Sequence, residues 1–192
     1  SINTLSDWVQ KVAGLQTVDT LEEIMLLHSI YLQTGRCETL DEFLPLGRTL
    51  CNDFEEIDMH MVRIDWFFRE LRNLASMKVY EPATELSASQ LDYLKFWERF
   101  EVLYKTHRTE LKTLGKANAG MIFRQVAENI EAISKDLSNF YFVGFDGLTK
   151  AEETIIRHMH THAKATVFWN TDAYYVENTE REAGYFFRKY FK

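Results

Sequence analysis

Three histidines near the end of the chain have a spacing that could serve metal chemistry. His158, His160 and His162 alternate with other residues, and on a strand this alternation would place three imidazoles on one face. On a helix the same spacing turns successive side chains by roughly 200° about the axis, so the ligands would diverge. We favour a helix C-terminus, where imidazoles complement the exposed carbonyl groups and the helix dipole.

A dense run of carboxylates offers a second chemistry, the binding of Mg²⁺. The run consists of Asp53, Glu55, Glu56 and Asp58. Runs of like charge usually form a solvated helix face or pair with nearby cations. The arginines that follow in the sequence are Arg63, Arg69 and Arg72. The preferred interpretation is therefore a solvated helix face or an ion-pair partner for these arginines.

Aromatic side chains that could stack on nucleic-acid bases occur in two stretches. They are Trp66, Phe67, Phe68, Phe96, Trp97 and Phe100. Proteins that bind single strands combine stacking residues with a positively charged groove, and these stretches are not interleaved with a matching set of lysines and arginines. Packing in a helical core is the preferred interpretation.

Motifs for nucleotide binding and nucleophilic catalysis are missing from the sequence. Gly115-Lys116 is followed by Ala117 and lacks the earlier glycine of a phosphate-binding loop. The E-x-K of a nuclease occurs at Glu110–Lys112, but in a predicted helix with no strand carboxylate before it. The two cysteines form no C-x-x-C pair and are expected to be reduced thiols. We assign no catalytic residue, cofactor-binding residue or metal ligand to this chain.

The elements that must position these residues are mostly helices. Proline and glycine are scarce before residue 138, and apolar residues recur there every three or four positions. This periodicity predicts six helices, the second opened by Asp19 or Thr20 and the third by Thr39 or Asp41. Their approximate ranges are 5–12, 21–32, 41–60, 61–77, 87–115 and 120–137.

The pattern changes after residue 138. Two short apolar runs, at 140–145 and 165–170, flank a helical stretch that Thr149 and Glu152 can open with a capping box. Strand, helix and strand within so few residues predict one parallel βαβ crossover. Two strands do not make a stable sheet alone, so we expect a piece of a larger sheet. Asp146 follows the first strand, where open α/β sheets collect catalytic groups.

The predicted fold is therefore mostly α with a small α/β part. A six-helix subdomain over residues 1–138 precedes a βαβ fragment of an incomplete parallel sheet over residues 139–192. Residues 1–58 carry a net charge of −8 and the rest of the chain one of +1, and the acidic first third argues against autonomous binding of DNA. A basic leader and an apolar stretch of roughly 20 residues are both missing. We expect a soluble, cytoplasmic protein with no membrane partner.

Two motifs in the βαβ part carry a family resemblance. The first, G-F-x-x-L-T-x-x-E, includes Gly144, Phe145, Leu148, Thr149 and Glu152. The second, W-x-x-D-x-Y-Y followed by E-A-G, includes Trp169, Asp172, Tyr174, Tyr175, Glu182, Ala183 and Gly184. With the stretch 46–74, they resemble Bacteroidetes-type proteins of the PD-(D/E)XK nuclease superfamily. Those proteins are similar to the AddB/RexB-type subunit of helicase–nuclease complexes, an inactivated superfamily I helicase.

This resemblance implies a helicase-like sheet without a working motor. An active helicase would carry Mg²⁺-binding carboxylates at the end of the first strand, where this chain has Gly144-Phe145. The nuclease carboxylates, its lysine and the Mg²⁺ they hold would belong to the parent protein beyond residue 192. The motif positions would then have structural or DNA-related roles. They are Gly144, Phe145, Thr149, Glu152, Trp169, Asp172, Tyr175, Glu182 and Gly184.

Under the resemblance, the function is that of a non-catalytic scaffold segment in a DNA-repair exonuclease of the AddAB type. Its partners would be an active helicase–nuclease subunit and, through the parent protein, DNA during recombination and double-strand-break processing. Sheet-edge apolar residues of 140–145 and 165–169 should then be exposed, giving dimers or crystal pairing. One alternative is a free-standing helical adaptor that binds proteins through its acidic helices. Another is a small hydrolase that uses Asp146 with a histidine of 158–162.

Overall fold

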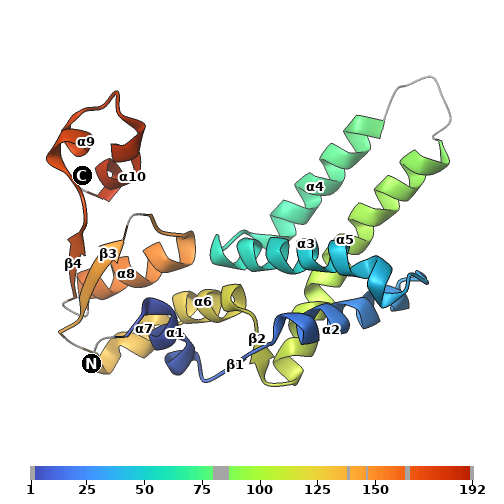
Figure 1. Ribbon diagram of the computed structural model, residues 1–192, viewed down its shortest axis with the longest axis horizontal. Coiled ribbons are helices and arrows are strands. Elements are labelled where there is room, and N and C mark those ends of the chain that lie inside the picture. Colours follow the sequence, from blue (N-terminus) through green and yellow to red (C-terminus); the bar gives the residue numbers. More distant parts are fainter. Residues whose placement is uncertain (1–2, 80–86, 138, 146, 163–164, 191–192) are drawn as a thin grey trace. The chain divides into compact units, whose positions relative to one another are not determined.

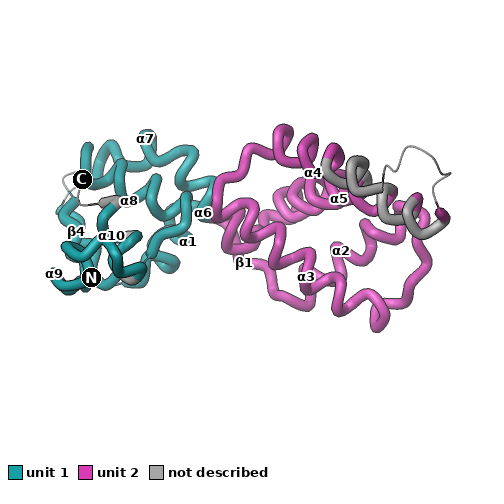
Figure 2. The backbone as a smooth tube through the Cα atoms, turned by 90° about the horizontal axis from the view of Figure 1, so that it is seen from above, with its two compact units in different colours: residues 1–13, 123–192 teal, residues 14–122 magenta. Residues whose placement is uncertain are grey.

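The computed structural model describes residues 3–79, 87–137, 139–145, 147–162 and 165–190. The backbone is mostly helical with two small parallel sheets (Figure 1), so the predicted fold class is confirmed. The chain divides into two compact units, residues 14–122 and residues 1–13 with 123–192 (Figure 2). The predicted domains, 1–138 and 139–192, are defined by fold type rather than by contacts, and that division stays a prediction.

Four long helices build the unit of residues 14–122. They are α2 (Thr20–Gln33), α3 (Leu40–Met59), α4 (Ile64–Val79) and α5 (Ala88–Thr113). The Asp19 carboxylate caps α2 by accepting from the backbone N–H of Leu21 at 2.9 Å. A capping box of Thr39 and Glu42 opens α3. Both caps are among the predicted helix starts, and each satisfies backbone N–H groups that have no partner within the helix.

A small parallel sheet of two strands, each two residues long, joins the two ends of this unit. Strand β1 (Gln16–Thr17) precedes α2, and strand β2 (Lys116–Ala117) follows α5. These strands could not be predicted from the sequence, because a strand of two residues is too short to show an alternation of apolar and polar side chains. Their pairing holds the start and the end of the four-helix unit together.

The core of the four-helix unit is aromatic. Phe54 on α3 packs edge-on against Phe100 and Tyr104 of α5, with ring centroids 5.2 Å apart in both pairs. Phe68 joins the same cluster from α4. Core packing is thus confirmed for most of the aromatic residues considered as base-stacking candidates. Trp66 is the exception and lies half-exposed on α4.

The second unit combines short helices with the βαβ element. Its helices are α1 (Leu5–Ala13), most of α6 (Ala119–Glu128), α7 (Ile130–Ile133), α8 (Lys150–His162), α9 (Ala173–Glu177) and α10 (Tyr185–Tyr190), with 3-10 turns at Ser134–Asp136 and Glu182–Gly184. The single helix predicted over 120–137 is wrong, because the chain breaks at Asn129. The Asn129 side chain donates to the carbonyl of Gln125 at 2.7 Å, where it competes with the helical backbone.

Strands β3 (Tyr141–Phe145) and β4 (Thr166–Trp169) pair in parallel on either side of α8, as predicted. Tyr141 lies opposite Thr166 and Val143 opposite Phe168. The register is irregular at Gly144, which has φ +84°, a conformation that glycine adopts without strain. Helix α8 lies beside the two strands (Figure 1). Burial alternates over the first three residues of β3, where Phe142 is buried between the exposed Tyr141 and Val143.

Candidate functional site

The end of β3 is the place where a nucleotide-hydrolysing motor would carry its carboxylates. Gly144 forms the bulge there, and a Cβ added to it would meet no atom within 4 Å, so its backbone conformation is what requires glycine. The Phe145 ring lies 6.5 Å from the Trp169 ring at the end of β4. Asp146 lies outside the described residues. The described residues at this end of the sheet therefore form an aromatic contact.

Thr149 and Glu152 form the predicted capping box at the start of α8. The Thr149 backbone N–H donates to Glu152 Oε2 at 2.8 Å, and the Thr149 hydroxyl donates to the same oxygen at 2.9 Å. In return, the Glu152 N–H donates to Thr149 Oγ1 at 3.4 Å. The two motif residues thus fix the helix that joins the two strands.

The second motif folds into a compact turn that follows β4. Asp172 caps α9 by accepting from the Tyr174 N–H at 2.8 Å. A Cβ added at Gly184 would overlap the Tyr175 carbonyl oxygen, so only glycine allows this close approach. The structure therefore brings Asp172, Tyr175 and Gly184 together, while Glu182 lies exposed where the 3-10 turn begins.

Arg188 holds this turn together and was missed by the sequence analysis. Its guanidinium donates to the carbonyl oxygens of Tyr175, Asn178 and Arg181, each at 2.9 Å. The feature of the sequence that could have indicated this role is its position four residues after Gly184, on α10. A guanidinium has five donors in a fixed plane, which suits it to gathering several backbone carbonyls.

A shallow pocket of about 680 Å³ opens beside this turn, at the carboxyl end of β4. Its lining residues are Asn170, Thr171, Asp172, Ala173, Tyr175 and Phe187. Open α/β sheets bind ligands at the carboxyl ends of their strands. Asp172 is the charged residue among the described residues of this lining, and its carboxylate already caps α9. The pocket offers amide, hydroxyl and phenol groups, which suit recognition better than proton transfer.

The three histidines lie in the last turns of α8, so the predicted helix end is confirmed. His158 Nε2 is 2.9 Å from the hydroxyl oxygen of Ser134, and His160 Nδ1 is 2.9 Å from the carbonyl oxygen of Ala165. The rings of His158 and His162 stack with centroids 4.5 Å apart. Within the described ranges, no group of three or more histidine, cysteine, aspartate or glutamate residues could hold a metal ion.

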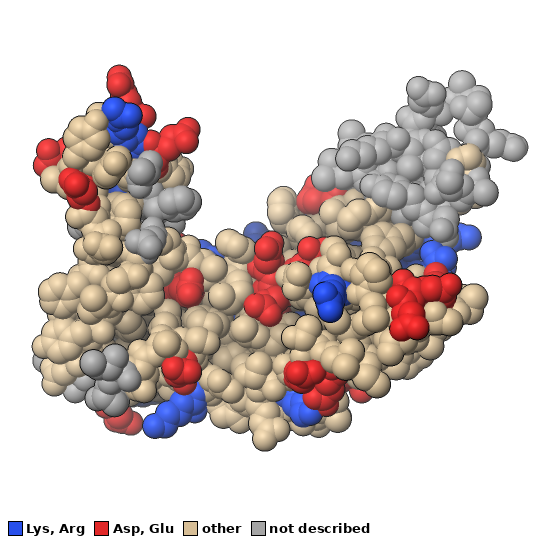
Figure 3. Space-filling model, in the orientation of Figure 1, with Lys and Arg blue, Asp and Glu red and all other residues tan. Residues whose placement is uncertain are grey.

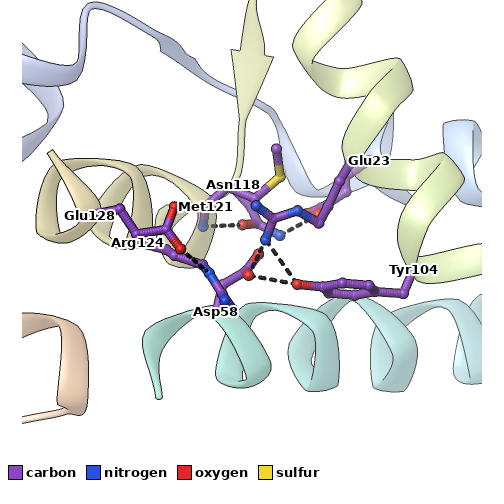
Figure 4. Close-up of polar contacts among 8 residues, drawn as sticks. Glu23, Asp58, Tyr104, Asn118, Met121, Arg124 and Glu128 are labelled. Atoms are coloured by element: carbon purple, nitrogen blue, oxygen red, sulfur yellow. Dashed lines mark hydrogen bonds and ion pairs between the residues drawn. The ribbon is translucent and has the colours of Figure 1, made fainter. Parts of the chain in front are cut away.

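The carboxylate run of α3 corrects one expectation. Asp58 is 1% exposed and accepts hydrogen bonds from the Tyr104 hydroxyl, at 2.6 Å, and from Arg108 (Figure 4). The expected solvated face is therefore wrong for this residue. The cation that pairs with Asp58 is Arg108 of α5. Arg72, one of the arginines expected to pair with the run, pairs with Glu101 instead.

A second buried polar cluster joins α2, α5 and the segment before α6. Glu23 Oε1 accepts from the Asn118 amide at 2.9 Å and lies 3.1 Å from His107 Nε2 (Figure 4 shows the Glu23–Asn118 contact). Asn118 Oδ1 accepts in turn from the Met121 N–H at 2.9 Å. All three side chains are buried. The sequence placed His107 on an apolar stripe of its helix but gave no sign of its partners.

A cavity of about 230 Å³ adjoins this cluster and includes Glu23, Cys51 and Glu55 in its lining. Burial, with the charges of Glu23 and Glu55, raises the pKa of the Cys51 thiol to about 12. Burial and the Glu23 charge also raise the pKa of Glu55. A thiol with such a pKa is protonated at neutral pH and is a poor nucleophile. Cys51 and the exposed Cys37 are both free.

Comparison of the chain with protein-family models, with curated proteins and with solved structures gives no match. Among the described residues, no helix combines the length and the apolar character that crossing a membrane requires.

Proposed function

We propose that the chain is a non-catalytic, helicase-like scaffold segment of a DNA-repair helicase–nuclease. The observation that carries the proposal is the bare face of the β3–β4 sheet, where Tyr141, Val143 and Phe168 are 69%, 68% and 52% exposed. Parallel sheets are normally covered on both faces, and two strands alone are below the size of a stable sheet. This unit has the construction of a sheet that other strands and a further layer complete.

The end of β3 supports the non-catalytic part of the proposal. A motor strand ends in carboxylates that hold Mg²⁺ and orient the attacking water. In this chain a glycine at positive φ and a phenylalanine that contacts Trp169 occupy those positions. Neither side chain can bind a cation through oxygen. Mg²⁺ would be bound by the nuclease part of the parent protein.

The charge distribution supports an indirect relation to DNA. The net charge of −7 disfavours autonomous binding of phosphates. The segment would shape the DNA channel or the interface with an active helicase–nuclease subunit, while other parts of the parent protein contact DNA in double-strand-break processing.

The test begins with the parent gene and continues with its product. We expect a longer reading frame with a carboxylate–lysine nuclease signature and Mg²⁺-dependent exonuclease activity in the purified complex. Phe168→Asp should release the helicase subunit and reduce nuclease activity, whereas Val102→Asp, at an equally exposed position of α5, should do neither. A product without exonuclease activity, or a frame that stops near residue 192, would overturn the proposal.

A free-standing helical adaptor is the second candidate. Leu21 and Met25 lie one turn apart on α2, and both are about half-exposed. The exposed Glu22 lies beside them in the first turn of the helix. Apolar anchors with charged neighbours are typical of helix-mediated recognition. Met25→Glu should then abolish capture of the partner while Phe168→Asp leaves it intact, the opposite of what the scaffold requires.

A further inference from the structure

A groove of about 840 Å³ runs along one edge of β3. Its lining residues are Asn3, Thr4, Leu5 and Trp8 from the α1 region, and Asn139, Phe140, Tyr141, Phe142, Val143 and Phe145 from the β3 region. Side chains of consecutive β3 residues point to opposite faces of the sheet. Residues from both faces, such as Tyr141 and Phe142, nevertheless line the groove. No residue of β4 is among the lining residues. The groove therefore follows the strand edge that faces away from β4, with α1 as its other wall.

The hydrogen bonds of the ladder show which main-chain groups face this groove. The Thr166 N–H donates to the Phe140 carbonyl at 2.9 Å, so the carbonyl of Phe140 points toward β4. Main-chain groups of successive residues point to alternate edges of a strand. The N–H and C=O groups of Tyr141 and Val143 therefore point into the groove. Within the described residues, the sheet has β4 as its second strand and no third.

We propose that this groove binds an extended, uncharged peptide segment of a partner protein, which pairs with β3 as a third strand. Strand addition of this kind takes its affinity from main-chain hydrogen bonds and its selectivity from alternate side chains. The Trp8 and Phe140 rings, in edge-on contact at 5.7 Å, supply an apolar wall. The exposed Tyr141 and Val143 side chains flank the new strand on the bare sheet face.

Charge complementarity points to an uncharged occupant. A quarter of the chain is charged, at 27% of residues, yet none of the described residues that line the groove is charged. The surface over β3 and β4 is likewise tan in Figure 3, without blue or red side chains. A charged segment would lose its hydration there without gaining a partner. This inference rests on the geometry of the groove and not on the proposed function.

The test uses the whole chain and a fluorescein-labelled heptapeptide of alternating valine and threonine. We expect saturable binding in fluorescence anisotropy, with a Kd below about 1 mM. The same peptide N-methylated at alternate residues keeps one free edge and should still bind. The fully N-methylated peptide has no N–H to donate and should lose at least about tenfold in affinity. These peptides test the main-chain pairing on the unaltered protein.

Two variants at one position give the matched control. Val143→Pro removes an N–H that faces the groove and leaves the bonds to β4 intact, a position where edge strands tolerate proline. Val143→Thr keeps that N–H and the branched side-chain shape. We expect Val143→Thr to bind the peptide and Val143→Pro to lose binding, with equal circular dichroism and thermal midpoints. If Val143→Pro does not fold, the N-methylated peptides decide alone.

Three outcomes would overturn the assignment. The first is an absence of binding at about 1 mM peptide. The second is equal binding of the free and fully N-methylated peptides, which would mean that side chains alone are recognised. The third is a concentration-dependent dimer in sedimentation that Val143→Pro abolishes, which would assign the groove to a second copy of the chain.

Discussion

The aromatic cluster of the helical unit and the two-stranded sheet of the other unit differ in how completely they are covered. In residues 14–122, Phe54 and its aromatic neighbours are buried, and the polar Asp58 and Glu23 inside have hydrogen-bond partners. In the unit that contains β3 and β4, large apolar side chains lie exposed on a sheet of two strands. The first unit has a closed aromatic core, although Leu21 and Met25 are half-exposed at its surface, whereas the sheet of the second unit has an exposed apolar face of the kind that marks interaction sites.

The comparison predicts very different costs for truncating an aromatic side chain in each unit. Phe54→Ala should lower the free energy of unfolding of the helical unit by about 3–5 kcal/mol, because it leaves a cavity in a packed cluster. Phe168→Ala should change stability by about 0.5 kcal/mol or less, because its ring is half-exposed. Urea unfolding, followed by amide exchange of each unit, measures both. Equal costs would remove the distinction between the units.

The buried polar contacts of the helical unit test how much its hydrogen bonds add to the stability of its core. Asp58→Ala removes the acceptor of the Tyr104 hydroxyl and the Arg108 guanidinium, and should cost about 2–3 kcal/mol because it strands these groups. Glu56→Ala, two residues earlier at an exposed position of the same helix, should be nearly neutral. A small cost at Asp58 would mean that the aromatic packing alone holds α3 against α5. The measurement is the urea midpoint of both variants.

Within the second unit, the turn after β4 should be packed more tightly than the exposed sheet beside it. Gly184→Ala would force a methyl group against the Tyr175 carbonyl oxygen, and should cost about 1–2 kcal/mol of local stability. Amide exchange in α9 and α10 should accelerate accordingly. Gly147→Ala is the control, since a Cβ there meets no atom within 4 Å. Unchanged exchange in Gly184→Ala would mean that Arg188 does not fix this turn.

Local features were predictable from the sequence, and long-range ones were not. Thr149 and Glu152 lie three residues apart, so their capping box could be predicted from spacing alone. The contact between Glu23 and Asn118 joins residues 95 positions apart, and no periodicity encodes such a pairing. Arg188 was missed for a different reason: its partners lie only 7 to 13 positions away, but they are backbone carbonyls, which any residue type supplies.

The candidate site divides in the same way. The expected exposure of apolar side chains on both strands is confirmed in part: Tyr141, Val143 and Phe168 are exposed, whereas Phe142 and Ala165 are buried. Dimer formation stays a prediction. The groove beside β3 could not be predicted. Its second wall is α1, whose position against the strand depends on the fold of the whole unit. The presence of only two predicted strands indicated an incomplete sheet but not which of its edges is open.

The smallest expected effect is the pH dependence of the helical unit. Burial and the neighbouring Glu23 charge raise the pKa of Glu55 in the folded state, so the folded chain binds a proton there more tightly than the unfolded chain does. The ionised carboxylate therefore costs stability, and the cost grows as pH rises from the unfolded pKa through the folded one. Glu55→Gln should increase the free energy of unfolding at pH 7 by up to about 0.5 kcal/mol, which is measured as a slightly higher urea midpoint. This gain should vanish in acid. Glu56→Gln, on the exposed side, should show no such pH-dependent gain. A gain that persists at low pH would mean that Glu55 is penalised by its packing rather than by its charge, and the polar interior of this unit would then be less well satisfied than its hydrogen bonds imply.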